Sequence, residues 1–539
     1  MEILKIENLT FTYPNTARRV LDGISFSIDE GDFCVLAGGT GGGKSTLLRL
    51  CKPTLSPHGT RTGEIFYKGT PLGDLPPREA AARIGFVCQM PEQQIVCDKV
   101  WHELAFGLEN LGLPQSEIAR RTAEMASYFG IEPWFDLPVS ALSGGQKQLL
   151  NLASVMVMRP DLLILDEPTS QLDPIAAAEF LHTLKKLNRD FSLTVLIAEH
   201  RLEELVPMCD KLIVLHEGKL LGADTPRALV PAIAQHPALL ASMPTALRVG
   251  CALGNAAYPL SVKEGRGMIA PYAQGKARVL PESIPEKGRK IALELKNVCF
   301  RYDRTEKDVL QSLSLTLYAG ETLCVLGGNG SGKSTMLGVA AGLRKPYAGK
   351  VTVLGKHMRN YRGGELYREC LSLLPQDVQT AFLCNTVREE LADAKISPDA
   401  LPFDLSHLLD THPYDLSGGE QQLLALAKAL ATKPGILLMD EPTKGLDAEK
   451  KAMLLGVLAT LKAQGVSILI VTHDVEFAAL CADRCVLFFR GAAVSDGLPR
   501  AFFAENNFYT TAARRMTRGY FDNAVTVRDV VALCKGETV

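Results

Sequence analysis

The sequence lacks the features that mark membrane-spanning, exported and disulfide-stabilised proteins. No apolar run approaches 18 residues, and residues 1–5 carry no signal-peptide pattern. The 13 cysteines are scattered and odd in number, and no C-x-x-C pair occurs among them. We therefore expect reduced thiols in a cytoplasmic chain, so that any role at a membrane must come through a partner.

An excess of positive charge is also missing. The 58 Lys and Arg residues are balanced by 60 Asp and Glu residues. A strong nucleic-acid binder should show a clear basic excess, so this balance predicts no nucleic-acid partner. The composition, 47% hydrophobic and 22% charged, is that of an ordinary globular protein, and 539 residues are too many for one hydrophobic core. The chain should therefore form several structural units.

What the chain does contain is one phosphate-binding pattern, present twice. Residues 38–45 and 327–334 both fit G-x-x-x-x-G-K-[ST], each between an apolar run and an apolar helix-like segment. Such glycines let backbone N–H groups surround a phosphate at the start of a helix. The lysines would reach the outer phosphates, and the serines would bind Mg²⁺. The expected contacts are Gly38, Gly43, Lys44, Ser45 and Thr46, and in the second copy Gly327, Gly332, Lys333, Ser334 and Thr335.

Two apolar runs each end in adjacent acids, Asp166 with Glu167 and Asp440 with Glu441. Continuous apolar runs suit strands that are covered on both faces, and ligands bind at the carboxyl ends of such strands. There the aspartate can hold Mg²⁺, and the glutamate can orient or deprotonate an attacking water. Alone, an Asp-Glu pair would more simply cap the next element. Its pairing with a glycine loop in both halves favours catalysis.

A second pair of phosphate-type helix starts is formed by serine and glycine. A serine hydroxyl and exposed N–H groups at a helix start make an anion site, although a plain N-cap is the simpler interpretation. Duplication argues against a plain cap, because each half then has two such sites and needs one for its own nucleotide. The segments are Ser143, Gly144, Gly145 and Gln146, and Ser417, Gly418, Gly419 and Glu420.

The chain is an internal repeat whose halves align with a nearly constant offset. The offset is 289 at the loop lysines (333 − 44) and 287 at Gln89 and Gln376, but 274 at Ser143 and Ser417. The second half is therefore shorter by 13 residues (287 − 274) in this stretch. In the first half the stretch holds three segments with helical apolar spacing: 100–112, 114–121 and 122–129.

Strands and helices alternate in both halves, which predicts an α/β fold with mostly parallel sheets covered by helices. The expected divisions are a first domain (1–230), an appendage and linker (231–290), a second domain (291–500) and a C-terminal appendage (501–539).

On these residues the chain resembles two fused ATP-binding-cassette (ABC) ATPase domains, over nearly all of 1–230 and 291–500. The resemblance implies two P-loop domains in tandem, each with a parallel-sheet core, an antiparallel β subdomain and a helical subdomain. It also implies that the two domains pair within the chain around ATP and Mg²⁺. One composite site would join Lys44, Ser45, Asp166, Glu167 and His200 with Ser417 and Gly419; the other would join Lys333, Ser334, Asp440, Glu441 and His473 with Ser143 and Gly145.

Four further pairs of residues match family landmarks. Three of them also have plainer interpretations: the tyrosines as half-buried strand residues, the histidines as structural residues, and Asp173, which precedes Pro174, as a helix N-cap. Tyr13 and Tyr302 would stack on adenine; Gln89 and Gln376 would contact Mg²⁺ and water; His200 and His473 would touch the γ-phosphate; Asp173 and Asp447 would face each other's domain across the interface. The chain departs from the family at Thr40 and Gly42, at Glu420, where glutamine is usual, and at Leu149 and Leu423, where arginine is common. None of these changes removes a catalytic group, so we expect two competent sites that can differ in rate.

Residues 89–110 resemble the ATPases of energy-coupling-factor (ECF) importers, and residues 375–392 keep a looser version. That resemblance implies uptake of a vitamin or transition-metal ion at the cytoplasmic face of a prokaryotic membrane. The implied partners are an integral-membrane scaffold and a small substrate-binding membrane protein. The alternatives are the tandem ATPase of another importer, for example of sugars, and a soluble ribosome-associated tandem ABC ATPase. Residues 223–259, apolar and dotted with prolines, lack the charged helical linker usual in the latter.

Overall fold

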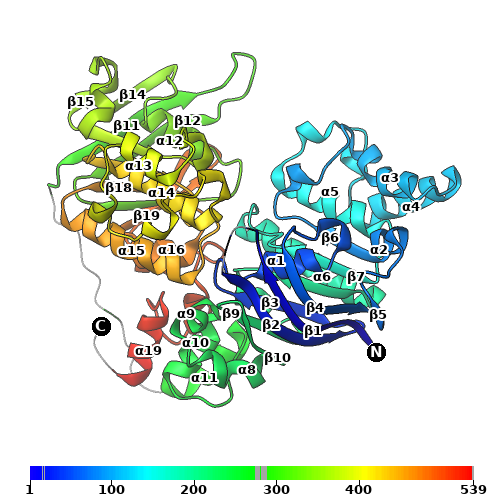
Figure 1. Ribbon diagram of the computed structural model, residues 1–539. Coiled ribbons are helices and arrows are strands. Elements are labelled where there is room, and N and C mark those ends of the chain that lie inside the picture. Colours follow the sequence, from blue (N-terminus) through cyan, green and yellow to red (C-terminus); the bar gives the residue numbers. More distant parts are fainter. Residues whose placement is uncertain (15, 17, 274–279, 281–287, 537–539) are drawn as a thin grey trace. The chain divides into compact units, whose positions relative to one another are not determined.

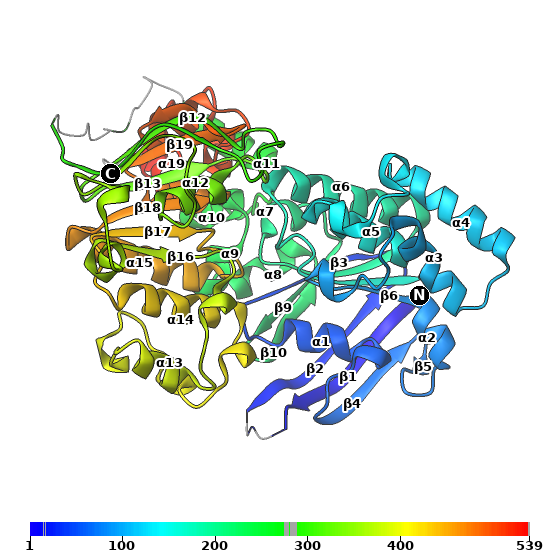
Figure 2. The same ribbon diagram turned by 90° about the horizontal axis from the view of Figure 1, so that it is seen from above.

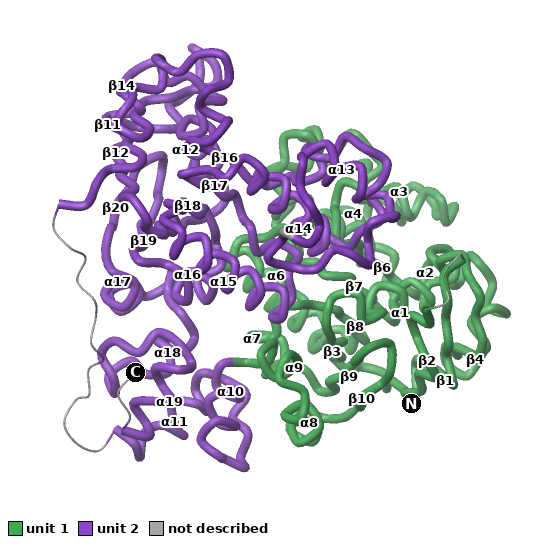
Figure 3. The backbone as a smooth tube through the Cα atoms, turned by 60° about the vertical axis from the view of Figure 1, so that its left-hand side comes forward, with its two compact units in different colours: residues 1–244 green, residues 245–539 purple. Residues whose placement is uncertain are grey.

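The computed structural model describes residues 1–539 except 15, 17, 274–279, 281–287 and 537–539. The chain divides into two compact units, unit 1 (residues 1–244) and unit 2 (residues 245–539) (Figure 3). Each unit contains a six-stranded sheet and a four-stranded antiparallel sheet, with helices around them (Figure 1). This confirms the α/β class and the tandem repeat.

The six-stranded sheet of unit 1 has the order β10-β9-β3-β8-β7-β6. Five strands are parallel and the edge strand β10 is antiparallel. Strands such as β7 and β8 are buried at every residue, as expected of apolar runs covered on both faces. The strands are β3 (Phe33–Gly38), β6 (Ile84–Val87), β7 (Leu162–Asp166), β8 (Thr194–Ala198), β9 (Lys211–His216) and β10 (Lys219–Asp224); the second sheet holds β1 (Glu2–Thr12), β2 (Arg19–Asp29), β4 (Thr60–Tyr67) and β5 (Thr70–Pro71).

Unit 2 repeats this topology, with the order β16-β17-β18-β13-β19-β20 in its larger sheet. The strands are β13 (Thr322–Leu326), β16 (Leu371–Leu374), β17 (Ile436–Asp440), β18 (Ser467–Thr472), β19 (Arg484–Phe489) and β20 (Ala492–Gly497); the second sheet holds β11 (Ile291–Phe300), β12 (Leu310–Tyr318), β14 (Ala348–Val353) and β15 (Lys356–His357).

Most helices also repeat, but α2 of unit 1 corresponds to a short π-helix at Leu366–Cys370 in unit 2, and the helices differ in the stretch that differs in length. Unit 1 has α1 (Lys44–Leu50), α2 (Pro77–Arg83), α3 (Val100–Asn110), α4 (Gln115–Tyr128), α5 (Gly144–Met156), α6 (Pro174–Phe191), α7 (Leu202–Leu205), α8 (Pro226–Ile233) and α9 (Pro237–Ser242). Around its sheets unit 2 has α12 (Lys333–Ala340), α13 (Val387–Asp393), α14 (Gly418–Leu430), α15 (Ala448–Ala463), α16 (Val475–Cys481) and α17 (Pro499–Glu505). After α3, unit 1 has the long helix α4; between α13 and α14, the described residues of unit 2 have only short 3₁₀ turns, at Pro398–Ala400, Ser406–Leu408 and Pro413–Asp415.

The expected division of residues 114–129 into two helices is wrong, because α4 is continuous across Arg121 and Thr122 (Figure 2). Thr122 and Met125 form its buried face, while Glu117 accepts hydrogen bonds from Arg120 and Arg121 at 2.8 and 2.7 Å. Such pairs three and four residues apart stabilise an uninterrupted helix.

A small helical cluster in unit 2 joins segments from distant parts of the sequence. Helices α10 (Thr245–Ala252) and α11 (Val262–Ile269) pack with α18 (Ala512–Thr517) and α19 (Val527–Lys535) (Figure 1). Their apolar contacts include Val249, Ile269, Met516, Val530 and Leu533. Helices α11 and α19 begin in the same way, because Ser261 caps α11 and Thr526 caps α19.

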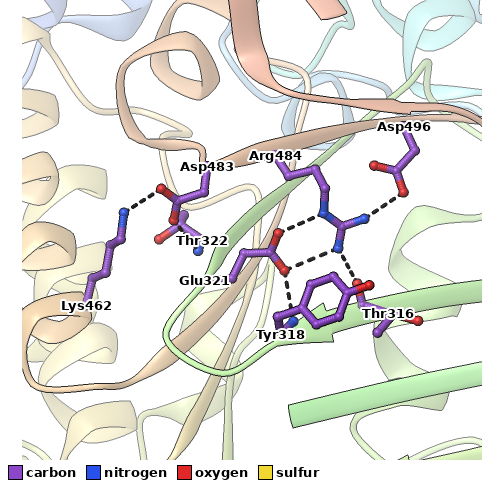
Figure 4. Close-up of polar contacts among 8 residues, drawn as sticks. All are labelled: Thr316, Tyr318, Glu321, Thr322, Lys462, Asp483, Arg484 and Asp496. Carbon is purple, nitrogen blue, oxygen red and sulfur yellow. Dashed lines mark hydrogen bonds and ion pairs between the residues drawn. The ribbon is translucent and has the colours of Figure 1, made fainter. Parts of the chain in front are cut away.

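An ion-pair network holds the amino ends of β13 and β19 (Figure 4). Arg484 binds Glu321 through Nε–Oε1 (2.7 Å) and Asp496 through Nη1–Oδ2 (2.6 Å), and it also donates to the Thr316 carbonyl. Glu321 is 2% exposed. Asp483 accepts a hydrogen bond from Thr322 N at 2.9 Å. Because ligands of parallel sheets bind at the carboxyl ends of the strands, this network is structural.

Candidate functional site

The two glycine loops fold over their own lysines in the same way. Lys44 Nζ donates to the carbonyls of Gly38 (2.9 Å) and Gly39 (3.0 Å), and Lys333 Nζ donates to those of Gly327 and Gly328 (both 2.9 Å). Each loop runs from a buried central strand, β3 or β13, into the first turn of α1 or α12. The lysines thus stand where the sheet, the loop and a helix start meet, which suits an anionic ligand.

The last glycine of each loop could be no other residue without a clash. Gly43 and Gly332 have φ angles of +91° and +102°, in the left-handed region. A Cβ at Gly43 would lie 2.8 Å from the carbonyl oxygen of Val20, and one at Gly332 would lie 3.0 Å from that of Val309. Both glycines are also the N-cap residues of their helices, so the backbone can turn inward without obstruction.

A buried aspartate lies beside each loop serine. Ser45 Oγ donates to Asp166 Oδ1 at 2.8 Å. Burial raises the pKa of Asp166 and of Asp440 to about 6, although a serine hydroxyl hydrogen bond opposes the rise in each case. Asp440 Oδ1 is buried without a hydrogen-bond partner in the described part of the chain. A buried carboxylate oxygen in this position fits a hard cation such as Mg²⁺, which prefers oxygen ligands.

The glutamate after each aspartate is held in a strained backbone conformation. Glu167 and Glu441 have φ angles of +46° and +50°, which non-glycine residues seldom adopt. Their N–H groups donate to Ala198 O (2.9 Å) and Val471 O (2.8 Å) on the neighbouring strand, which fixes the turn. The same unusual backbone conformation therefore recurs at this position in both units.

Each glutamate is paired with the predicted histidine. His200 Nε2 lies 2.9 Å from Glu167 Oε1, and His473 Nδ1 lies 2.9 Å from Glu441 Oε2. Burial alone would raise the pKa of both glutamates, but the histidines hold the pKa of each below its usual value. The carboxylates are therefore ionised at neutral pH and able to accept a proton.

The two predicted glutamines differ in their contacts. Gln89 Nε2 donates to Glu167 Oε2 at 2.9 Å, so the first half joins glutamine, glutamate and histidine. Gln376 is exposed after β16, and the described residues include no hydrogen bond from it to Glu441. The expected equivalence of the halves is therefore incomplete at this point.

The serine–glycine segments begin α5 and α14 with reciprocal capping bonds. Ser143 accepts from Gln146 N at 3.3 Å, and Ser417 accepts from Glu420 N at 3.4 Å. In the second segment Ser417 Oγ also donates to Glu420 Oε2 at 2.6 Å and receives Lys450 Nζ at 3.4 Å. The described residues show no hydrogen bond between either segment and the glycine loop of its own unit. The segments thus cap helices and leave Gly144 and Gly418 with open space at the Cβ position.

The remaining predicted residues lie near these groups with local structural roles. Tyr13 and Tyr302 have their hydroxyls 3.1 and 3.0 Å from Thr46 Oγ1 and Thr335 Oγ1. Asp173 and Asp447 cap α6 and α15, each accepting a backbone N–H at 2.9 Å. The capping interpretation of Asp173 is therefore confirmed, and Asp447 caps its helix in the same way, whereas the role of both across an interface stays a prediction.

Sequence reasoning missed three buried acids near the site. Glu199 follows β8, and Glu103 and Glu390 lie at equivalent positions in α3 and α13. Glu103 Oε2 accepts the N–H groups of Val96 and Cys97 at 3.0 and 2.8 Å, which fixes the loop after Gln89. For Glu103 and Glu390 the available signal was the recurrence of a glutamate at the offset of 287, whereas Glu199 has no such repeat because Thr472 stands at its equivalent position.

Comparison with known proteins adds independent findings. The profile of the ABC transporter family matches residues 21–170 and 310–444. Over 99% of its length the chain is 39% identical to a Bacillus thuringiensis subsp. konkukian protein provisionally named an ABC transporter ATP-binding protein, of which it covers 98%. It is 33% identical, over 94% of this chain and 93% of the relative, to Bacillus subtilis YkoD, provisionally named an HMP/thiamine import ATP-binding protein.

Among solved structures, an archaeal ribosome recycling factor in complex with a ribosomal stalk protein matches with a TM-score of 0.59 at 20% identity, covering 92% of this chain and 91% of that one. At this identity the likeness shows a shared fold alone. No helix in the described part of the chain is long and apolar enough to span a membrane.

Proposed function

The chain belongs to the ABC transporter family, as an ATPase with two such domains in tandem, and on this premise we propose that it drives an ECF-type importer. The observation that carries the catalytic part of this proposal is the repeated glutamate–histidine pair at 2.9 Å, placed after a buried aspartate in both units. The importer part is supported by the resemblance of residues 89–110 and by the import function in the name of the relative YkoD.

Each catalytic centre would hydrolyse ATP with its own glutamate. Glu167 or Glu441 would take a proton from the water that attacks the γ-phosphorus, and the paired histidine would keep the carboxylate oriented toward that water. Lys44 or Lys333 would move from the carbonyls that it now contacts to the outer phosphates. As the water oxygen bonds to the γ-phosphorus, the bond from that phosphorus to the β,γ-bridging oxygen breaks, which yields ADP and phosphate.

Mg²⁺ bound with ATP would be held by Ser45 and Asp166 in one centre and by Ser334 and Asp440 in the other, with Gln89 and Gln376 nearby. The ion would supply charge neutralisation at the β- and γ-phosphates. Burial raises the pKa of each aspartate only to about 6, so both remain mostly ionised at neutral pH, and a bound cation would favour the ionised form further.

ATP would bring the two domains together, because the serine–glycine helix start of one would complete the phosphate site of the other. Ser417 and Gly419 would serve the nucleotide on Lys44, and Ser143 and Gly145 the nucleotide on Lys333. Loss of phosphate would remove the charge that both domains contact and let the domains separate. A membrane scaffold that binds one domain spacing better than the other would then change conformation with each cycle. The chain would act at the cytoplasmic face of the membrane, with a separate small membrane protein binding a vitamin or metal ion.

Replacing both glutamates tests the catalytic assignment. The Glu167→Gln/Glu441→Gln variant should lose at least a hundredfold in turnover, because the amide cannot accept the water proton, while ATP binding stays within twofold. Steady-state hydrolysis and equilibrium ATP binding measure the two effects. Undiminished hydrolysis would refute the assignment.

The importer assignment is tested by purification from membranes of the native host. The chain should be recovered with an integral-membrane scaffold and a small second membrane protein. Recovery with ribosomes and without any membrane protein would overturn the importer role and leave the ATPase assignment standing.

A further inference from the structure

A buried acid beside the first catalytic centre has no counterpart in the second. Glu199 directly follows β8 and precedes His200, and it is 3% exposed. The equivalent position in the second half (199 + 273) is Thr472, which is fully buried. Glu199 follows the last residue of β8 and Thr472 is the last residue of β18, and each directly precedes the histidine, but one carries a carboxylate and the other a hydroxyl.

The Glu199 carboxylate collects three donors. Oε1 accepts the backbone N–H of Thr169 at 2.8 Å and its hydroxyl at 2.6 Å, and Oε2 accepts the backbone N–H of His200 at 3.2 Å. All three partners are donors, which favours the ionised carboxylate, whereas burial acts against it and raises the pKa of Glu199 above its usual value. Glu199 thereby connects the turn after Glu167 to the residue that pairs with Glu167.

The second half distributes the same donors differently. Thr472 Oγ1 accepts the N–H of Asp474 at 3.0 Å, and the backbone N–H of His473 donates to Glu441 Oε2 at 3.2 Å. Glu441 thus uses Oε2 for both groups of its histidine. In the first half Glu199 takes the histidine N–H, and Glu167 Oε2 accepts Gln89 instead.

We propose that Glu199 is a positioning residue that reserves one oxygen of Glu167 for Gln89. Hydrolysis in the first half then depends strongly on this glutamine, whereas hydrolysis in the second half depends less on Gln376. The inference rests on the proposed catalytic roles of Glu167 and Glu441. It means that the catalytic glutamate is coupled more strongly to its glutamine in the first half than in the second. Gln89 is followed in the sequence by the loop that Glu103 anchors.

A double-mutant cycle on the full chain tests the inference. All variants carry Glu441→Gln, which silences the second centre. In this background the effect of Gln89→Ala on kcat is measured twice, once with Glu199 present and once with Glu199→Thr, which introduces the residue found in the second half. We expect Gln89→Ala to lower kcat about tenfold with Glu199 present, since a hydrogen bond to a charged group is lost, and about twofold with Glu199→Thr. KM for ATP should stay within twofold throughout, because Glu199 does not touch nucleotide.

Two further substitutions at the same position separate charge from shape. Glu199→Asp keeps a carboxylate and should retain part of the dependence on Gln89, whereas Glu199→Gln keeps the shape and should lose that dependence. Glu199→Gln also decides the matter if Glu199→Thr fails to fold. In the second half, with Glu167→Gln as background, Gln376→Ala should cost about twofold.

The inference is overturned if Gln89→Ala lowers kcat by the same factor with and without Glu199. It is also overturned if the Glu199→Gln variant keeps the wild-type dependence of kcat on Gln89. Hydrolysis that survives in the Glu167→Gln/Glu441→Gln chain would instead defeat the catalytic assignment itself. The two failures are therefore distinguishable.

Discussion

The two units have the same backbone conformation around the catalytic residues but differ in the side-chain contacts that these residues make. Lys44 and Lys333 make the same pair of carbonyl contacts, and Glu167 and Glu441 share the same unusual φ. Around them the partners differ, because Gln89 contacts its glutamate and Gln376 does not. Duplication of a site therefore preserves its geometry more faithfully than the contacts that regulate it.

The largest expected difference between the two units is in the free energy of unfolding that is lost when the cation at the amino ends of the central strands is removed. Arg484→Met should destabilise the β13–β19 region by about 3–5 kcal/mol, because it leaves Glu321 buried without its cation. The equivalent Lys211→Met should cost about 1 kcal/mol or less, since Lys211 lies 3.9 Å from Asp32 and both are partly exposed. Hydrogen exchange of amides in β13 and β3 measures each loss separately. Equal losses would break the comparison.

A smaller difference is expected at the acids that fix the loops after the glutamines. Glu390 is fully buried and accepts the N–H groups of Leu383 and, at 2.7 Å, of Cys384, and it also pairs with Lys428. Glu103 accepts the two equivalent N–H groups but has no cation within 4 Å among the described residues. Lys428→Ser, which imports Ser154, should cost about 1–3 kcal/mol, less than a typical broken buried pair, because unit 1 shows that N–H donors alone can hold the carboxylate.

Exchange of the Cys384 amide reports the local loss in Lys428→Ser, and Ser154→Ala is the matched control, for which exchange of the Cys97 amide should change little. A loss of 3–5 kcal/mol would show that the pair in unit 2 has become indispensable and that the halves are held differently.

The smallest difference concerns the contact between the glutamine turn and the serine–glycine helix. Lys147 Nζ lies 3.0 Å from Glu92 Oε1, whereas the equivalent Gln421 and Gln379 share an amide hydrogen bond at 3.3 Å. Glu92→Gln should cost at most about 1 kcal/mol, and this cost should shrink in 1 M salt because the charges are partly exposed. Gln379→Ala should show no such salt dependence in the same thermal unfolding assay. A salt-independent loss in Glu92→Gln would remove the distinction.

The sequence predicted the features that depend on backbone periodicity and local motifs. Continuous apolar runs identified β7 and β17, and the glycine loops and capping serines lie at the predicted helix starts. These features depend on neighbours along the chain. The family resemblance placed Glu167 and His200 in one site but did not predict their contact, which arises because the adjacent parallel strands β7 and β8 bring their carboxyl ends together.

Contacts between distant residues could not be predicted in the same way. Nothing local to Glu199 indicated that it would bind Thr169, and Lys428 resembles any other helical lysine until Glu390 is placed beside it. The break expected within residues 114–129 was wrong because apolar spacing alone does not register the Glu117–Arg121 pair. Long-range satisfaction of buried charge is decided by packing, which one sequence does not reveal.

The helical cluster of α10, α11, α18 and α19 has a consequence for the continuity of the polypeptide. It packs residues that precede positions 274–287 against residues near the carboxyl terminus, with Arg266 donating to the Arg518 carbonyl. A cut between those positions would therefore leave two fragments clasped by buried apolar surface. Two separately encoded chains could therefore be held together by this helical cluster in place of the peptide connection.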